Sequence, residues 1–208
     1  MKIALINASP KPSHSGSGNL MACLEKDFPK KSSVKCFELH KKEIPEATLR
    51  ELLDMDTWVI LCPLYIDALP SHLLSCLVQV EKAAPAKKIR IYGVINCGFY
   101  EGIQTETGFE VMKNWCARCG FEFCGGMGIG GGGLLSTVPA LENKNHPKLG
   151  VLIKFKGFAR SIAKGREYPV VYKSTSMPRP IYKAGAEISW RVIAAKNGNK
   201  PWSLGKKY

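Results

Sequence analysis

Residues 57–70 read TWVILCPLYIDALP, and this stretch decides the fold. Its first part, 57–62, is an unbroken apolar run, which is typical of a strand buried on both faces of a parallel sheet. A loop with proline at each end follows, and 70–82 then has the leucine and valine spacing of a helix, with Pro70 at its favoured first turn. The stretch therefore predicts a strand, a loop and a helix in succession.

The same alternation continues on both sides of this stretch. Strands are predicted over 2–7, 34–39, 57–62 and 89–95, with a fifth beginning at 121–124, and helices over 20–28, 45–55, 70–82 and 105–119. Strands and helices that alternate at this spacing form βαβ units. We therefore expect an α/β fold with a flavodoxin-like, doubly wound, five-stranded parallel sheet.

The last third of the chain has a different composition. Residues 1–133 carry 15 basic and 14 acidic side chains, whereas residues 134–208 carry 15 basic and 3 acidic ones, so the second part holds nearly all of the +13 net charge. Amphipathic helices are predicted over 147–164 and 181–196. We interpret 1–133 as the sheet domain and 134–208 as a basic helical extension packed on it.

A basic surface of this kind suits nucleic acid, an anionic membrane surface or a phosphate-bearing substrate. Aromatic residues lie between its charges and favour helix packing instead, so no nucleic-acid partner is expected. No apolar run reaches the ~20 residues of a membrane span. The N-terminus lacks the pattern of a signal peptide, so we expect a cytoplasmic location and free thiols for the eight cysteines.

The loop after the first strand, residues 9–20, is rich in serine and glycine, contains Lys11 and no carboxylate, and leads into a helix. The N-terminus of a helix attracts phosphate through its free N–H groups and its dipole. An ordinary serine-rich, capped surface loop is the alternative interpretation. The segment is not a P-loop, because the Gly-Lys-Ser/Thr ending is missing.

Two later loops have features that suit a planar ring. In 63–70 the prolines stiffen the loop, and Tyr65 offers an aromatic face. In 96–102 glycine lets the backbone approach a ligand, and Phe99 and Tyr100 add aromatic surface. Taken singly, each also fits an ordinary strand-to-helix turn.

Together these three loops resemble the FMN loops of the flavodoxin-like NAD(P)H-dependent reductases, a family that includes NAD(P)H:FMN and NAD(P)H:quinone reductases. The resemblance covers residues 1–130, and 63–70 is its most specific part, with Asp67 and Pro70 in register. It implies an enzyme that passes hydride from NAD(P)H through bound FMN to a small acceptor such as a quinone or a flavin. It also implies a homodimer and no side-chain general base.

The resemblance further implies that the first loop binds the FMN phosphate and that the other two border the isoalloxazine ring. The implied cofactor-binding residues are Ser9, Lys11, Ser15, Ser17 and Asn19, then Pro63, Leu64, Tyr65 and Ile66, and finally Asn96, Cys97, Gly98 and Phe99. Pro12 and His14 stand where the family often has Arg or Gly, so the individual phosphate donors stay open.

Two other motifs have competing interpretations. Residues 125–133 contain Gly-x-Gly-x-x-Gly twice, but they follow the fifth strand rather than the first, so we interpret them as a flexible loop beside the flavin that leaves room for substrate. Cys116, Cys119 and Cys124 are fewer thiols than the four that a structural zinc or iron–sulfur site needs. We expect no metal and favour structural thiols, with a redox disulfide left open.

Two further functions compete with the reductase. One is a flavodoxin-type electron carrier, which the basic last third disfavours because such carriers are typically acidic. The other is an FMN-free binding module that holds an anionic partner with its basic tail.

Overall fold

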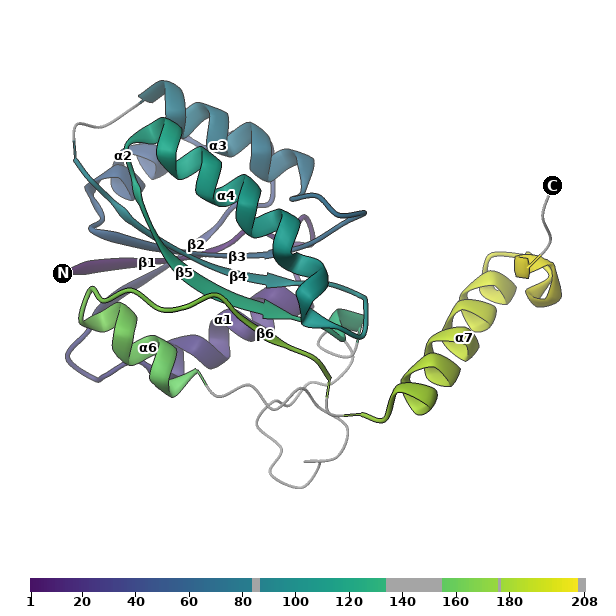
Figure 1. Ribbon diagram of the computed structural model, residues 1–208. Helices are drawn as coiled ribbons and strands as arrows, with labels where there is room; N and C mark the ends of the chain where they lie inside the picture. Colours follow the sequence, from purple (N-terminus) through teal and green to yellow (C-terminus); the bar gives the residue numbers. More distant parts are fainter. Residues whose placement is uncertain (84–86, 134–154, 176, 206–208) are drawn as a thin grey trace.

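The computed structural model describes residues 1–83, 87–133, 155–175 and 177–205 (Figure 1). Within them, six strands form one all-parallel sheet in the order β2-β1-β3-β4-β5-β6. The strands are β1 (Lys2–Asn7), β2 (Ser33–Glu38), β3 (Thr57–Pro63), β4 (Arg90–Asn96), β5 (Glu122–Ile129) and β6 (Val171–Lys173).

Helices cover both faces of the sheet (Figure 1). One face carries α2 (Glu46–Asp54), α3 (Ser71–Ala83) and α4 (Glu106–Cys119), and the other carries α1 (Gly16–Asp27) and α6 (Lys156–Ala163). Two short 3₁₀ helices, η1 (Gly102–Thr105) and η2 (Pro201–Gly205), and the long α7 (Arg179–Lys196) complete the described elements. Figure 1 shows α7 apart from the two helical layers.

The central strand β3 explains why the sheet needs cover on both faces. All seven of its residues are buried. Trp58 packs against Trp115 and Phe121 in the core on the α2–α3–α4 side, whereas the next residue, Val59, belongs to the core on the α1–α6 side. Alternate residues of a strand point to opposite faces, so an unbroken apolar run feeds both cores.

The predicted fold class is confirmed, with one correction. Five strands were expected, and the sheet has six, because β6 pairs in parallel with the edge of β5. β6 is only three residues long and contains a lysine, so its sequence lacks the apolar run of the interior strands.

The interpretation of 125–133 as a flexible loop is wrong for its first half. Gly125, Gly126 and Gly128 lie inside β5 and are buried. A Cβ atom at Gly126 would lie 2.3 Å from the carbonyl oxygen of Gly93 on β4, and Gly125 has a φ of +105°. These glycines therefore serve close packing and an unusual backbone turn at the strand.

Part of the stretch 134–208 contributes to the sheet and its core. Phe155, Phe158 and Ile162, at and within α6, are buried against the strands. Of the helix predicted over 147–164, residues 147–154 lie outside the described residues, and the rest forms α6. No described helix has the length and apolar content needed to cross a membrane.

Candidate functional site

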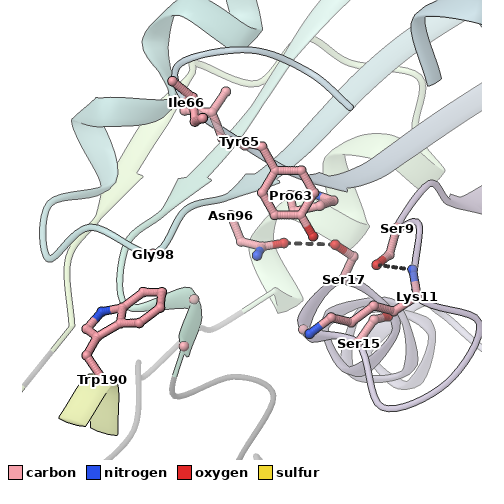
Figure 2. Close-up of a pocket in the computed structure, with 14 residues that line it drawn as sticks. Ser9, Lys11, Ser15, Ser17, Pro63, Tyr65, Ile66, Asn96, Gly98 and Trp190 are labelled. Atoms are coloured by element: carbon pink, nitrogen blue, oxygen red, sulfur yellow. Dashed lines mark hydrogen bonds between the residues drawn. The ribbon is translucent and has the colours of Figure 1, made fainter. Parts of the chain in front are cut away.

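A pocket of about 640 Å³ opens at the carboxyl ends of the strands (Figure 2). β1 lies between β2 and β3, so the loops after β1 and β3 leave the sheet in opposite directions and create a crevice at this switch point. The described residues that line the pocket are Ser9, Lys11, Ser15, Gly16, Ser17, Pro63, Leu64, Tyr65, Ile66, Asn96, Gly98, Gly132, Gly133 and Trp190.

The N-terminus of α1 forms one end of the pocket. Ser15 is its N-cap, with an extended backbone, and its Oγ accepts a hydrogen bond of 3.0 Å from the backbone N–H of Gly18. The first N–H groups of a helix have no acceptor within the helix, and those of Gly16 and Ser17 belong to this set. A ligand with negative charge can therefore bind here.

A buried hydrogen bond connects the first loop to the end of β4. The Ser17 hydroxyl donates to Oδ1 of Asn96 at 2.9 Å, and both residues are buried (Figure 2). Nearby, Oγ of Ser9 accepts from the backbone N–H of Lys11 at 3.2 Å. The Ser17–Asn96 bond holds the hydroxyl-rich loop to the end of β4, whereas the Ser9–Lys11 bond lies within the loop.

Asn7 of β1 and His40, just after β2, bond to the same loop, and Glu38 of β2 contacts both of them. Oδ1 of Asn7 accepts from the backbone N–H of Ser9 at 3.2 Å, and Nδ2 of Asn7 donates to Glu38 at 2.7 Å. Nδ1 of His40 lies 2.6 Å from the carbonyl oxygen of Ser9, so this nitrogen is the donor. Nε2 of His40 lies 3.0 Å from Glu38, which completes a closed network under the loop.

The loop after β3 is a tight turn with strained backbone. Tyr65 and Ala68 exchange backbone hydrogen bonds of 2.9 and 3.1 Å, and the two residues between them, Ile66 and Asp67, have φ angles of 48° and 59°. Two successive positive φ angles define a type I′ turn, which favours Asn and Gly over a β-branched residue. Ile66 is nevertheless 96% exposed at the pocket rim.

Tyr65 supplies aromatic surface to the pocket (Figure 2). Its side chain is about half exposed, and partial burial raises the pKa of its phenol. The phenol therefore stays neutral at physiological pH and can offer a hydroxyl donor and a ring face.

The loops after β4 and β5 are bonded to each other. The backbone N–H of Gly132 donates to the carbonyl oxygen of Cys97 at 2.6 Å, and that of Gly131 donates to Phe99 at 2.6 Å. A Cβ at Gly132 would lie 2.7 Å from the carbonyl oxygen of Cys97. Glycine at this position thus permits the close approach that brings Gly132 and Gly133 to the pocket.

Ten of the residues proposed from the sequence line this pocket. Three do not: Asn19 lies further along α1, Phe99 is half exposed, and Cys97 is buried with its thiol 3.6 Å from the carbonyl oxygen of Glu101. The pocket is also lined by Gly16, Gly132, Gly133 and Trp190, which were not among the proposed cofactor-binding residues. The run 125–133 was expected beside the flavin, but none of its glycines was named as a contact. Gly16 stands within the serine-rich loop, whereas Trp190 lies in a segment assigned to helix packing, where its sequence carries no signal of a site.

The charge of the pocket suits an anion at its α1 end. Among the described lining residues Lys11 is the charged one, and none is Asp or Glu. The α1 dipole adds positive potential at the same end.

The described cysteines are free thiols. Burial raises the pKa of each thiol, to about 11 for Cys124. Such thiols are protonated at neutral pH and react slowly. Among the described residues, no three His, Cys, Asp or Glu side chains gather as a metal site would need.

The sequence matches no model of a known protein family, and no curated protein resembles it significantly. Solved structures do match. An NADPH-quinone reductase from P. pentosaceus has a TM-score of 0.53 and 15% identity, covering 78% of this chain and 98% of its own. Smu.1420 from Streptococcus mutans UA159 has a TM-score of 0.51 and 12% identity, and the match covers 79% of this chain and 100% of that protein. The Trp repressor binding protein from Bacillus subtilis has a TM-score of 0.50 and 15% identity, and the match covers 62% of this chain and 85% of that protein.

The chain has a flavodoxin-like fold. Its strand order, β2-β1-β3-β4-β5, is the one found in flavodoxin, with β6 added at the edge. Flavodoxin itself binds FMN at the switch point between β1 and β3. The pocket described above lies at this same point.

Proposed function

We propose that the chain is an FMN-dependent oxidoreductase that passes hydride from NAD(P)H to a small acceptor such as a quinone or a flavin. One observation carries the proposal: the pocket at the β1/β3 switch point joins Lys11 and the serine-rich N-terminus of α1 at one end to an aromatic loop at the other. Its volume of about 640 Å³ lies within the range of about 300–1,000 Å³ of cofactor and small-molecule sites.

The α1 end fits a phosphate ester. Ser9, Ser15 and Ser17 are buried yet line the pocket, so their hydroxyls are held in place and little entropy is lost on binding. Lys11 adds a positive charge, and the N–H groups of the first turn of α1 add donors. The proposed role of Asn19 as a phosphate donor stays a prediction.

The other end fits a planar ring. Pro63, Leu64, Tyr65 and Ile66 provide apolar and aromatic surface on one loop. Gly98 has no side chain, and no atom lies within 4 Å of the place its Cβ would take, so a ring edge can approach the backbone there. Asn96, held by Ser17, lies between the two ends.

When bound, FMN would supply the hydride-transfer chemistry itself. The protein would bind the phosphate at α1, orient the ring with the β3 loop and stabilise charge at the ring edge with backbone N–H groups near Gly98. No side-chain general base is proposed. The NADPH-quinone reductase among the matching structures supports the acceptor class. A homodimer and a cytoplasmic location stay predictions.

A purified sample separates this proposal from the two alternatives. A yellow protein with flavin absorption bands excludes the FMN-free binding module. Anaerobic bleaching by NADPH or NADH, followed by return of the colour on adding a quinone, supports the reductase. A flavin that neither nucleotide reduces supports the electron carrier.

Ser15 offers a sharp test of the phosphate site. Asp and Asn are both good N-cap residues, so Ser15→Asp and Ser15→Asn should each keep α1 intact. Only Ser15→Asp places a carboxylate against the phosphate, and we expect its FMN affinity to fall at least about 100-fold, since two like charges near a protein surface repel by about 4 kcal/mol at 4 Å. Equal FMN affinity in both variants would contradict the assignment.

A further inference from the structure

One residue of the basic last third reaches the pocket. Trp190, on α7, lines it together with the loops of the sheet, and its indole side chain is 64% exposed. Figure 2 shows the indole beside Gly98, at the end of the pocket away from Ser9 and Lys11. It therefore lies at the ring end and not at the phosphate end.

Specific contacts hold the start of α7 against the loop after β4. The Tyr182 hydroxyl donates to the carbonyl oxygen of Gly98 at 2.6 Å, and its ring meets that of Tyr100 edge to face at 5.5 Å. Arg179 forms an ion pair of 2.8 Å with Glu101, and the Tyr100 hydroxyl donates to the carbonyl oxygen of Met177 at 3.0 Å. The helix is thus attached to the same loop that supplies the backbone wall of the pocket.

The helical repeat explains how this attachment directs Trp190. Tyr182 and Trp190 are eight residues apart, which places them roughly 80° apart around the helix axis, on the same half of α7. Once Tyr182 is bonded to Gly98, the indole about two turns later is held on the side of the helix that faces the pocket.

Exposed aromatic surface is concentrated around this end of the pocket. Tyr65 on the β3 loop is 47% exposed, and Trp190 on α7 is 64% exposed. They approach the pocket from different elements (Figure 2). An aromatic side chain that packs against another planar ring gains binding energy from the burial of apolar area. The ring–ring contact adds a further favourable contribution.

We propose that Trp190 packs against the isoalloxazine ring of FMN, so that α7 forms a wall of the cofactor site. This inference rests on the proposed function and adds a ring-contacting residue that lies outside the 1–133 segment. It gives the basic extension a role in binding, because loss of the α7 attachment would also remove the indole from the ring.

Flavin titrations of single variants test the proposal. We expect Trp190→Ala to raise the Kd for both FMN and riboflavin by the same factor, roughly three- to tenfold, because the contact is to the ring that both share. Trp190→Phe should keep most of the affinity. Trp202→Ala is the matched control, since Trp202 is also highly exposed but does not line the pocket, and it should leave both Kd values unchanged.

Tryptophan emission provides a second measurement. Flavin binding should quench the emission of the wild-type protein strongly, and Trp190→Phe should lose more of that quenching than Trp202→Phe. Because Trp190 is mostly exposed, its replacement should not prevent folding, and thermal unfolding of the apoprotein checks this.

The possible failures are distinguishable. A wild-type protein that binds neither flavin overturns the proposed function itself. A wild-type protein that binds FMN, with an unchanged Kd in Trp190→Ala, overturns only the role of Trp190. A loss for FMN without a loss for riboflavin would place the indole at the phosphate and would also overturn the proposal.

Discussion

Ile66 combines exposure with an unfavourable backbone conformation. It is β-branched, has a φ of 48° and is 96% exposed, whereas a type I′ turn normally has Asn or Gly there. Left-handed backbone costs roughly 1–2 kcal/mol for a residue with a Cβ. Strained residues of this kind are found at functional sites, and Ile66 lines the candidate pocket.

We expect Ile66→Asn to raise the free energy of unfolding by about 1 kcal/mol, because Asn tolerates the left-handed region. It should also weaken FMN binding, because a polar side chain replaces an apolar one at the ring end. Ile66→Val, which keeps the branched Cβ, is the control and should show no gain in stability. Urea unfolding measures both variants, and equal stability of the two would contradict the strain.

His72 makes stability depend on pH. Partial burial lowers its pKa below the usual 6.5, and its Nε2 lies 3.1 Å from the carbonyl oxygen of Leu39. Because the unfolded chain binds the proton more readily, the contribution of His72 is present above pH 6.5 and is lost as the pH falls towards the lower pKa of the folded state.

We therefore expect the free energy of unfolding to fall between pH 7 and pH 5, and His72→Gln to make this fall smaller. Gln keeps a donor for the Leu39 carbonyl but does not titrate in this range. The difference between the two pH profiles cancels the contributions of other groups. Parallel profiles would exclude His72 as a cause.

At the scale of elements, glycine decides how β5 fits the sheet. A Cβ at Gly125 would lie 1.6 Å from the carbonyl oxygen of Tyr168, in the segment leading to β6, and the residue has a φ of +105°. The backbone of Tyr168 in turn donates to Cys124 at 2.8 Å. Any side chain here would push the edge segment away from β5.

We expect Gly125→Ala to lower the free energy of unfolding by at least about 2 kcal/mol, from backbone strain and displacement of the edge. Gly157→Ala is the matched control, because Gly157 lies in α6 with no atom within 4 Å of its Cβ position. Alanine there should be neutral or slightly stabilising. A Gly125→Ala variant as stable as the wild type would show that the edge is free to move.

At the scale of the whole molecule, the sheet domain depends on residues beyond 133. Phe155 and Phe158 are at most 1% exposed and cover the face of the sheet near Tyr92. Burying each such side chain stabilises by about 1.5–3 kcal/mol, which is a large share of a typical stability of about 5–15 kcal/mol.

We expect a chain of residues 1–175 to fold and a chain of residues 1–133 to fail, because only the first keeps α6 and β6. Circular dichroism with thermal unfolding measures the outcome. A cooperative transition in the 1–133 chain would show that the sheet does not need α6.

The sequence by itself determined the order of the elements and the place of the loops that form the site. The apolar run of β3 predicted a doubly covered parallel strand, and the helices predicted up to residue 119 are present with small shifts at their ends. Ten of the thirteen proposed site residues line the pocket for the same reason: parallel strands bring their carboxyl-end loops to one edge. The periodicity of each strand and helix is a short-range property that a sequence records directly, and the alternation of the two implies parallel strands.

The tertiary structure alone decided the roles of the glycine run, of β6 and of Trp190. Gly126 must be small because Gly93 of another strand lies against it, and β6 forms because β5 presents an open edge. Trp190 reaches the pocket because Tyr182 bonds to Gly98, 84 residues earlier in the chain. Each of these facts depends on contacts between distant segments, and no local pattern of residues encodes which distant atoms will meet.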